Sequence, residues 1–207
     1  PGRIEQNQRN DIQSEKLTDN EIMEDWQYPL MKAMAEYAAE THGDVLEIGF
    51  GRGVSATLLQ EIGVRSHTII EANPYSVSDH YAPFRRRYGD RDIRIIEGRW
   101  QDVLDQLGEY DAVFFHAFPL NLAEFVEFIA ESVTFAEHFF PTAAKLMRPG
   151  GVFTYLTTEI DSISRRHQRS LFKHFREVCM KVQPVTVPPD TRDAWWADSM
   201  VVLRASL

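Results

Sequence analysis

The sequence predicts an α/β fold in which a mostly parallel β-sheet carries helices on both of its faces. Short apolar runs typical of buried strands alternate with helical patterns along most of the chain, and this alternation favours parallel strands joined by crossover helices. The first strong strand runs directly into a glycine-rich turn. The last two expected strands have no helix between them, so we expect an antiparallel pair at one edge of the sheet.

The first residues and the length of the chain indicate a leader followed by one domain. Residues 1–18 are polar and show no periodicity, so we expect a flexible leader, with ordering on ligand binding as an alternative. Residues 19–207 are enough to bury a core without disulfides or metals. We therefore expect a single domain, and both a monomer and a homodimer are compatible with the sequence.

The expected elements begin with a helix directly after the leader. Thr18 and Asp19 offer an N-cap. Beyond this cap, apolar side chains recur at the spacing of one helical face; they are Ile22, Trp26, Leu30, Met34 and Tyr37.

Alternating strands and helices follow up to the middle of the chain. Apolar runs bounded by turn residues predict the strands, and apolar residues at helical spacing predict the helices between them. The expected strands are 45–48, 67–71, 93–96 and 111–115, and the expected helices are 54–62, 76–88 and 101–107.

The second half of the chain continues the alternation and ends in the expected hairpin. Its elements are a helical stretch at 121–147 interrupted by Pro141, a strand at 151–156, a helix at 162–180, and strands near 182–187 and 199–204. Cys179 falls on the apolar side of the expected last helix, so we expect a buried core thiol. A single cysteine permits no disulfide within the chain, which suits a reducing, cytoplasmic setting.

The charge balance excludes some classes of partner. The chain has 31 acidic and 22 basic residues, a formal charge of −9, so we expect neither nucleic acid nor a membrane as its main partner, because both reward clustered Lys and Arg. No apolar run is long enough to span a membrane. The histidines show no metal-ligand spacing with cysteine or carboxylates, so we expect no metal site.

A glycine turn carries the strongest functional signal. In "DVLEIGFGRGVSATLL" (44–59) a strand is followed by three closely spaced glycines and a helix, and such turns let a ligand approach the backbone. Glu71 ends the next strand 22 residues after Gly49, where a carboxylate can accept ribose hydroxyls. The third glycine comes one position too early for a dinucleotide site. The pattern therefore favours a ligand with a ribose but no pyrophosphate, such as S-adenosylmethionine (SAM); the alternative is a turn that only packs helix on strand.

Several motifs then resemble a known family. "VLEIGFG", "IIEANP", "EGRWQDV", "LMRPGGVFTY" and "SMVVLRA" are similar, in this order, to motifs of class I SAM-dependent methyltransferases. "IMEDWQYPLMKAMA" (22–35), "FHAFPL" (115–120) and "VPPDTRDAWWADSMV" (187–201) resemble more closely the guanidinoacetate N-methyltransferase family. The resemblance implies a Rossmann-like seven-stranded sheet, SAM-dependent methyl transfer, SAM as the cofactor and S-adenosylhomocysteine as its product.

The resemblance also implies a cofactor site. Trp26 and Met31 would line it from the N-terminal helix, and the glycine turn with Glu47 would hold the methionine part. Glu71 would bind the ribose, and the remaining residues would frame the adenine. The implied cofactor residues are Trp26, Met31, Glu47, Gly49, Gly51, Glu71, Ala72, Gly98, Arg99 and Trp100. For Trp100, a place in the core is an equal alternative.

Two positions depart from the family pattern. A glutamate and an aspartate that would bind a guanidinium are replaced by Gln27 and His116, and neither neutral side chain supplies a bidentate anion. We therefore expect a small-molecule amine or hydroxyl acceptor other than guanidinoacetate. With a pKa of about 6.5, His116 is the expected general base or orienting residue, and Gln27 orients the acceptor. The alternative for His116 is a hydrogen bond to a backbone carbonyl at the strand end.

The rest of the expected acceptor site follows the fourth and fifth strands and the last loop. Glu159 or Asp161 could restore a lost carboxylate, and the indole pair could form an aromatic wall or simply pack. The expected acceptor-site residues are Ala117, Tyr155, Thr157, Thr158, Glu159, Trp195 and Trp196. Two other functions remain open: a non-catalytic SAM-binding module, and an enzyme that cyclises SAM or transfers another part of it.

Overall fold

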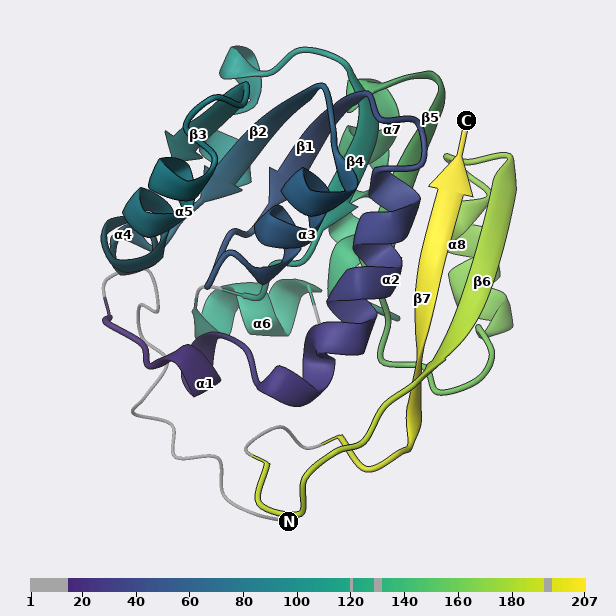
Figure 1. The fold of residues 1–207 in the computed structure, drawn as a ribbon. Coiled ribbons are helices and arrows are strands. Elements are labelled where there is room, and N and C mark those ends of the chain that lie inside the picture. Colours follow the sequence, from purple (N-terminus) through teal and green to yellow (C-terminus); the bar gives the residue numbers. More distant parts are fainter. Residues whose placement is uncertain (1–14, 120, 129–131, 192–194) are drawn as a thin grey trace.

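The predicted α/β fold is confirmed by the computed structural model, which describes residues 15–119, 121–128, 132–191 and 195–207. A seven-stranded sheet has the order β3-β2-β1-β4-β5-β7-β6 (Figure 1). β1 to β5 pair in parallel, and β7 runs antiparallel to both β5 and β6. The strands are β1 Asp44–Ile48, β2 Ser66–Glu71, β3 Ile93–Glu97, β4 Tyr110–Phe115, β5 Met147–Leu156, β6 Glu177–Pro184 and β7 Ser199–Ser206.

Helices cover both faces of this sheet, as the sequence predicts. α2, α3 and α5 lie on one face, and α7 and α8 lie on the other (Figure 1). The α-helices are α1 Asp19–Ile22, α2 Tyr28–Ala38, α3 Val54–Ile62, α4 Pro74–Ser76, α5 Ala82–Arg87, α6 Leu122–Phe128, α7 Phe140–Leu146 and α8 Arg165–Leu171. Short 3₁₀ helices cover Asp25–Gln27, Trp100–Asp102, Leu104–Gln106 and Phe135–Phe139, and a π-helical turn covers Val77–Tyr81.

The N-terminal helical segment is interrupted where the sequence predicts one continuous helix. Thr18 caps α1, and its N–H and hydroxyl both donate to the Glu21 carboxylate, at 2.9 and 2.8 Å. Met23 then adopts an extended conformation and ends α1. Pro29 lies in the first turn of α2, where a missing N–H costs nothing. The first 14 residues of the expected leader lie outside the described residues.

The helix expected at 162–180 is wrong in its second half. α8 ends at Leu171, and Glu177–Pro184 forms the edge strand β6. The pattern of this segment suits either element, and pairing with β7 decides for the strand. Cys179 is consequently exposed rather than buried, with its sulfur 3.7 Å from the Tyr37 hydroxyl.

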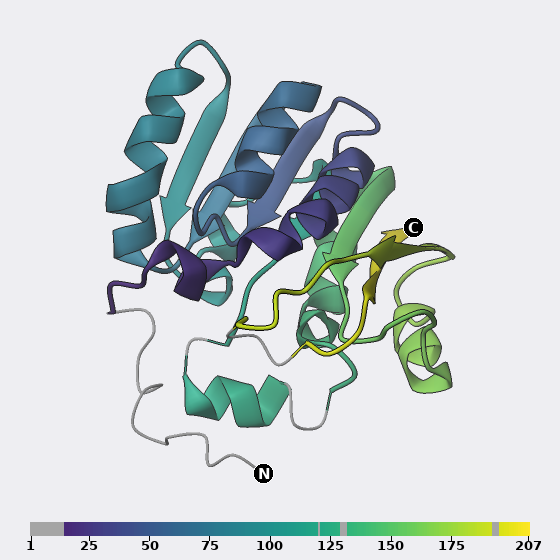
Figure 2. The same cartoon turned by 60° about the horizontal axis from the view of Figure 1, so that its bottom comes forward.

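The carboxyl ends of the parallel strands define one end of the molecule. α1, α6 and the long connection between β6 and β7 gather at this end (Figures 1 and 2). Ligands of open α/β sheets bind outside the carboxyl ends of the strands. The topology therefore places the segments of the candidate site together.

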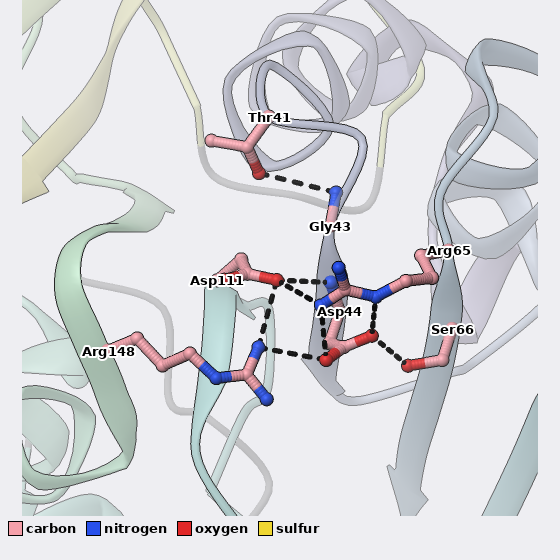
Figure 3. Close-up of polar contacts among 7 residues, drawn as sticks. All are labelled: Thr41, Gly43, Asp44, Arg65, Ser66, Asp111 and Arg148. Carbon is pink, nitrogen blue, oxygen red and sulfur yellow. Dashed lines mark hydrogen bonds and ion pairs between the residues drawn. The ribbon is translucent and has the colours of Figure 1, made fainter.

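The opposite end of the sheet is held by a charge cluster (Figure 3). The Asp44 carboxylate accepts hydrogen bonds from Arg65 at 2.7 and 2.8 Å, from Ser66 at 2.7 Å and from Arg148 at 2.8 Å. Asp111 accepts from the Asp44 N–H at 2.7 Å and pairs with both arginines at 2.9 Å. The cluster joins the starts of β1, β2, β4 and β5, and the Arg65 guanidinium holds the pKa of Asp44 well below its usual range.

Asp44→Asn should lower the free energy of unfolding by about 2 kcal/mol at pH 7, because charge-assisted hydrogen bonds are lost. Since folding lowers the pKa of Asp44, its contribution is present above its usual pKa of about 4 and is lost as the pH falls below it. Urea denaturation at several pH values measures the difference between the two proteins. The exposed Asp90→Asn is the control, and an equal loss in the control would contradict this role.

Candidate active site

The glycine turn follows β1 and lies against the end of β4. Gly49 and Gly51 have φ angles of 91° and 54°, in the left-handed region that favours glycine. A Cβ at Gly49 would overlap the carbonyl oxygen of His116, and one at Gly51 would lie 2.9 Å from Ile22. The turn is therefore enclosed by β4 on one side and by α1 on the other.

Glu71 supports this turn from the end of β2. Its Oε2 accepts hydrogen bonds from the N–H groups of Phe50 and Gly51, both at 2.8 Å, and its Oε1 accepts one from the Asn73 N–H at 2.7 Å. A carboxylate accepts about four hydrogen bonds, so about one position is left for a ribose hydroxyl. The open turn and this carboxylate fit SAM.

The expected adenine segment adjoins Glu71 at the ends of β2 and β3. Ala72 follows Glu71, and the Gly98 N–H donates to the Glu71 carbonyl at 2.8 Å. The Arg99 guanidinium pairs with Asp102 at 2.7 Å. The Trp100 ring is half-buried and packs edge-on against Phe139, with ring centroids 4.8 Å apart.

Two of the expected cofactor residues are fully buried. Met31 lies on the face of α2 that packs against the sheet. The Glu47 carboxylate accepts a hydrogen bond from the Ser55 hydroxyl and lies 2.9 Å from His67 Nε2. These partners turn the Glu47 carboxylate toward α3 and β2.

His116 directly follows β4, and its N–H donates to the Ile48 carbonyl at 3.0 Å. Its imidazole Nε2 is buried and has no hydrogen-bond partner among the described residues, so the alternative of a backbone carbonyl partner is not observed for this atom. Burial lowers the pKa of His116 to about 4. The imidazole is therefore neutral at pH 7, and its titration lies well below the value of about 6.5 that the sequence suggests.

Gln27 ends the 3₁₀ helix before α2 and is 9% exposed. Its neighbour Trp26 donates its Nε1–H to Glu24 at 2.8 Å and to Thr191 at 3.1 Å. Thr191 also donates to Glu24. These contacts hold the segment that carries Gln27 against the connection between β6 and β7.

The side chains after β5 form a network of their own. The Tyr155 hydroxyl lies 2.6 Å from His167 Nε2, and His167 Nδ1 lies 2.6 Å from Glu159. Glu159 also accepts from the Ser164 N–H at 2.7 Å. Tyr155 is fully buried, and burial raises its pKa well above the usual value. The two Glu159 oxygens are thus turned toward Ser164 and His167.

The remaining expected acceptor residues differ in how deeply they are buried. Ala117 follows His116 and is half-buried, and Thr157 is buried with its Oγ1 accepting from the Glu159 N–H at 2.9 Å. Thr158 is exposed. Asp161, considered as a substitute carboxylate, is exposed and accepts from the Ser162 hydroxyl at 3.1 Å.

Some contacts around the site could not be predicted from the sequence. The Asn73 side chain donates to the Glu15 carbonyl at 3.0 Å, and Lys16 pairs with Asp79 at 2.6 Å. The two residues of each contact are far apart in the chain, so no local sequence pattern indicates that they meet. These contacts place the segment before α1 against the residues that follow β2, while Ile22 at the end of α1 lies at Gly51.

The comparisons with known proteins decide the family. The family model described as guanidinoacetate N-methyltransferase matches residues 5–184. The chain belongs to this family. Membership confirms the predicted enzyme class, a SAM-dependent methyltransferase, and SAM as the cofactor.

Curated relatives of this guanidinoacetate N-methyltransferase family member are named protein arginine N-methyltransferase 2. The one from Aspergillus oryzae is 34% identical over 131 residues, which cover 59% of this chain and 31% of the relative. The one from Eremothecium gossypii is 32% identical over 146 residues, 65% of this chain and 32% of the relative. The chain thus spans about a third of the length of these relatives.

Solved structures confirm the Rossmann-like fold. The O-methyltransferase from Bacillus cereus in complex with S-adenosylhomocysteine has a TM-score of 0.58 at 17% identity, covering 89% of this chain and 82% of its own. TomG from Streptomyces achromogenes, an O-methyltransferase in complex with SAM, has a TM-score of 0.58 at 18% identity, covering 90% and 82%. At these identities the likeness shows the fold alone.

One prediction is overturned by the relatives. The expected small-molecule amine or hydroxyl acceptor, and with it a small molecule as the partner, is contradicted because the curated relatives are named for the methylation of protein arginine. The expectation assumed that a guanidinium needs carboxylates at positions 27 and 116. That premise is too strict, since neutral side chains also accept hydrogen bonds from guanidinium N–H groups.

No helix in the described ranges combines the length and the apolar character needed to cross a membrane. Within the same ranges, no group of three or more His, Cys, Asp or Glu side chains could hold a metal ion.

Proposed function

We propose that this chain transfers the methyl group of SAM to a guanidino nitrogen of an arginine side chain in a polypeptide. The proposal rests on the guanidino group, which is present both in the acceptor named by the family model and in the acceptor named by the curated relatives. The matching family is named for guanidinoacetate, and the curated relatives are named for protein arginine. Both acceptors present a guanidino group, although their remaining parts differ completely.

The neutral His116 suits a cationic acceptor. With a pKa of about 4, its imidazole carries no charge at pH 7 and does not repel a guanidinium, which stays protonated in proteins. Its buried Nε2 has no partner among the described residues and is available to accept an N–H of the acceptor. The Gln27 amide oxygen is the second proposed acceptor of a hydrogen bond. Both would orient the nitrogen toward the methyl donor.

Methyl transfer from SAM depends more on the position of the acceptor nitrogen than on its activation. A bound SAM supplies a methyl group on a positively charged sulfur, and the nucleophile must lie about 3 Å from it, in line with the C–S bond. A new N–C bond forms as the C–S bond breaks, and the guanidino group loses one proton. His116, with its low pKa, orients the N–H that loses this proton, and the proton ends in solvent.

Binding of the cofactor falls to the glycine turn and Glu71. Gly49 and Gly51 shape the turn that is the proposed site of the methionine part, and Glu71 is the proposed acceptor of a ribose hydroxyl. Ala72, Gly98, Arg99 and Trp100 remain the proposed surroundings of the adenine. These assignments rest on their common place at the carboxyl ends of β1, β2 and β3.

A panel of acceptors tests the proposed function. We expect S-adenosylhomocysteine to form with a peptide that contains one arginine, and not with the same peptide carrying lysine in its place. Free guanidinoacetate should be a poor acceptor, because it presents the guanidino group without the polypeptide on either side of an arginine. Turnover of the lysine peptide at the rate of the arginine peptide would contradict the proposal.

Gln27→Glu should lower the KM for the arginine peptide by about tenfold, since a charged acceptor makes hydrogen bonds about twice as strong as a neutral one. Steady-state kinetics measures this change, and SAM affinity by calorimetry serves as the internal control. Gln27→Leu, which removes the acceptor at similar volume, should raise the KM. An unchanged KM in both variants would remove Gln27 from the acceptor site.

A further inference from the structure

The connection between β6 and β7 forms a groove of about 540 Å³. This connection lies at the end of the molecule that also carries α1 and α6, beyond the carboxyl ends of the parallel strands (Figure 2). Residues that line the groove include Val185, Pro188, Thr191, Trp195, Trp196 and Asp198. No step of the proposed methyl transfer involves these lining residues.

An indole pair dominates the surface of the groove. Trp196 is 79% exposed, an unusual state for so large an apolar side chain. Trp195 is half-buried, and its Nε1–H donates to the Ser199 carbonyl at 3.2 Å. The two rings stack with centroids 6.4 Å apart. The Trp196 ring therefore rests against Trp195, which its hydrogen bond to Ser199 holds in place. Exposed tryptophans of this kind are frequent hot spots of protein recognition.

The groove adjoins the segment that carries Gln27. Thr191 lines the groove and also accepts the Trp26 Nε1–H at 3.1 Å. Trp26 directly precedes Gln27, one of the two residues proposed to orient the guanidino group. The groove therefore lies next to a segment that is proposed to position the acceptor.

The charge of the groove favours a basic occupant. Asp198 is exposed among its lining residues, and the sequence between β6 and β7 (185–198) carries three aspartates and one arginine. The chain as a whole carries a formal charge of −9. An indole face also attracts arginine and lysine side chains. Apolar, aromatic and acidic character together suit an extended polypeptide with positive charge.

We propose that this groove binds the basic polypeptide segment that flanks the methylated arginine. The inference rests on the proposed function, because it assumes that the acceptor is part of a polypeptide. Trp196 contacts a side chain next to the arginine, and Asp198 pairs with a neighbouring cation. Because of this groove, a polypeptide substrate binds more tightly than a single arginine does.

Two acceptors of different length test the groove. One is N-acetyl-arginine amide, and the other is a longer peptide in which glycine and lysine residues flank one arginine. Trp196→Ala should raise the KM for the longer peptide by about tenfold, as expected for a tryptophan hot spot, and leave the KM for the short acceptor unchanged. Phe172→Ala removes an aromatic ring that is 55% exposed at the end of α8 and should change neither value. Asp198→Asn should weaken binding of the longer peptide and reduce its salt dependence.

The outcomes separate this proposal from the proposed function. An equal KM change for both acceptors, or no change in Trp196→Ala, would overturn the groove as the binding site. If the wild type methylated neither acceptor, the proposed function would fail. In that case, fluorescence anisotropy of the labelled longer peptide still decides about the groove: weaker binding to Trp196→Ala than to Phe172→Ala supports it, and equal binding overturns it.

Discussion

Glu71→Ala should weaken the binding of SAM by about 100-fold, equivalent to about 3 kcal/mol. The substitution removes the proposed acceptor of the ribose and frees the N–H groups of Phe50 and Gly51, both of which donate to Glu71 at 2.8 Å. The glycine turn then loses the contact that fixes its shape. Isothermal titration with SAM and with S-adenosylhomocysteine measures the loss.

A control is needed because the same substitution weakens a buried hydrogen-bond network. Glu71→Gln keeps one oxygen that can accept from the turn, so it should bind SAM with an affinity between those of the wild type and Glu71→Ala. Glu109→Ala removes an exposed carboxylate just before β4 and should bind SAM as the wild type does. SAM binding by a folded Glu71→Ala variant with wild-type affinity would show that the ribose lies elsewhere.

His116→Ala should lower kcat/KM for the arginine peptide by about 100-fold, the size of loss expected when a reacting group is no longer held in position. SAM binding should change little, because His116 is assigned to the acceptor. Kinetics with the arginine peptide and calorimetry with SAM separate the two effects. A comparable loss of SAM affinity would place His116 at the cofactor instead.

The pH profile gives His116 a distinctive signature. Because burial lowers its pKa to about 4, the wild type should keep its activity from neutral pH down to about 5 and lose it as the imidazole becomes protonated near 4. The folded pKa lies below the usual 6.5, so the group also costs stability as the pH falls from about 6.5 to about 4. Unfolding measured at each pH separates this cost from loss of catalysis, and a rate that changes near pH 6.5 would contradict the low pKa.

Local patterns were sufficient for most of the fold and for part of the site. The strand, turn and helix around Gly49 and the carboxylate of Glu71 follow from residues close in sequence, and the structure places them together. The edge strand around Cys179 could not be predicted, because its pattern suits a helix equally well and its conformation depends on pairing with β7.

Contacts between distant parts of the chain also set features that local patterns do not reveal. The Glu47 carboxylate, beside the glycine turn, lies 2.9 Å from His67 on the next strand. The low pKa of His116 arises from burial by the rest of the fold, which residue type alone does not reveal. The small-molecule acceptor was wrongly predicted because the replacement of two acids does not by itself exclude a guanidinium.

The most direct test of the central claim is mass spectrometry of an arginine peptide after reaction with SAM that carries a deuterated methyl group. We expect a peptide heavier by one labelled methyl group, with fragmentation placing it on the arginine side chain and one S-adenosylhomocysteine formed per modified peptide. A label on any other residue, or SAM consumption without a labelled arginine, would contradict arginine methylation by this protein.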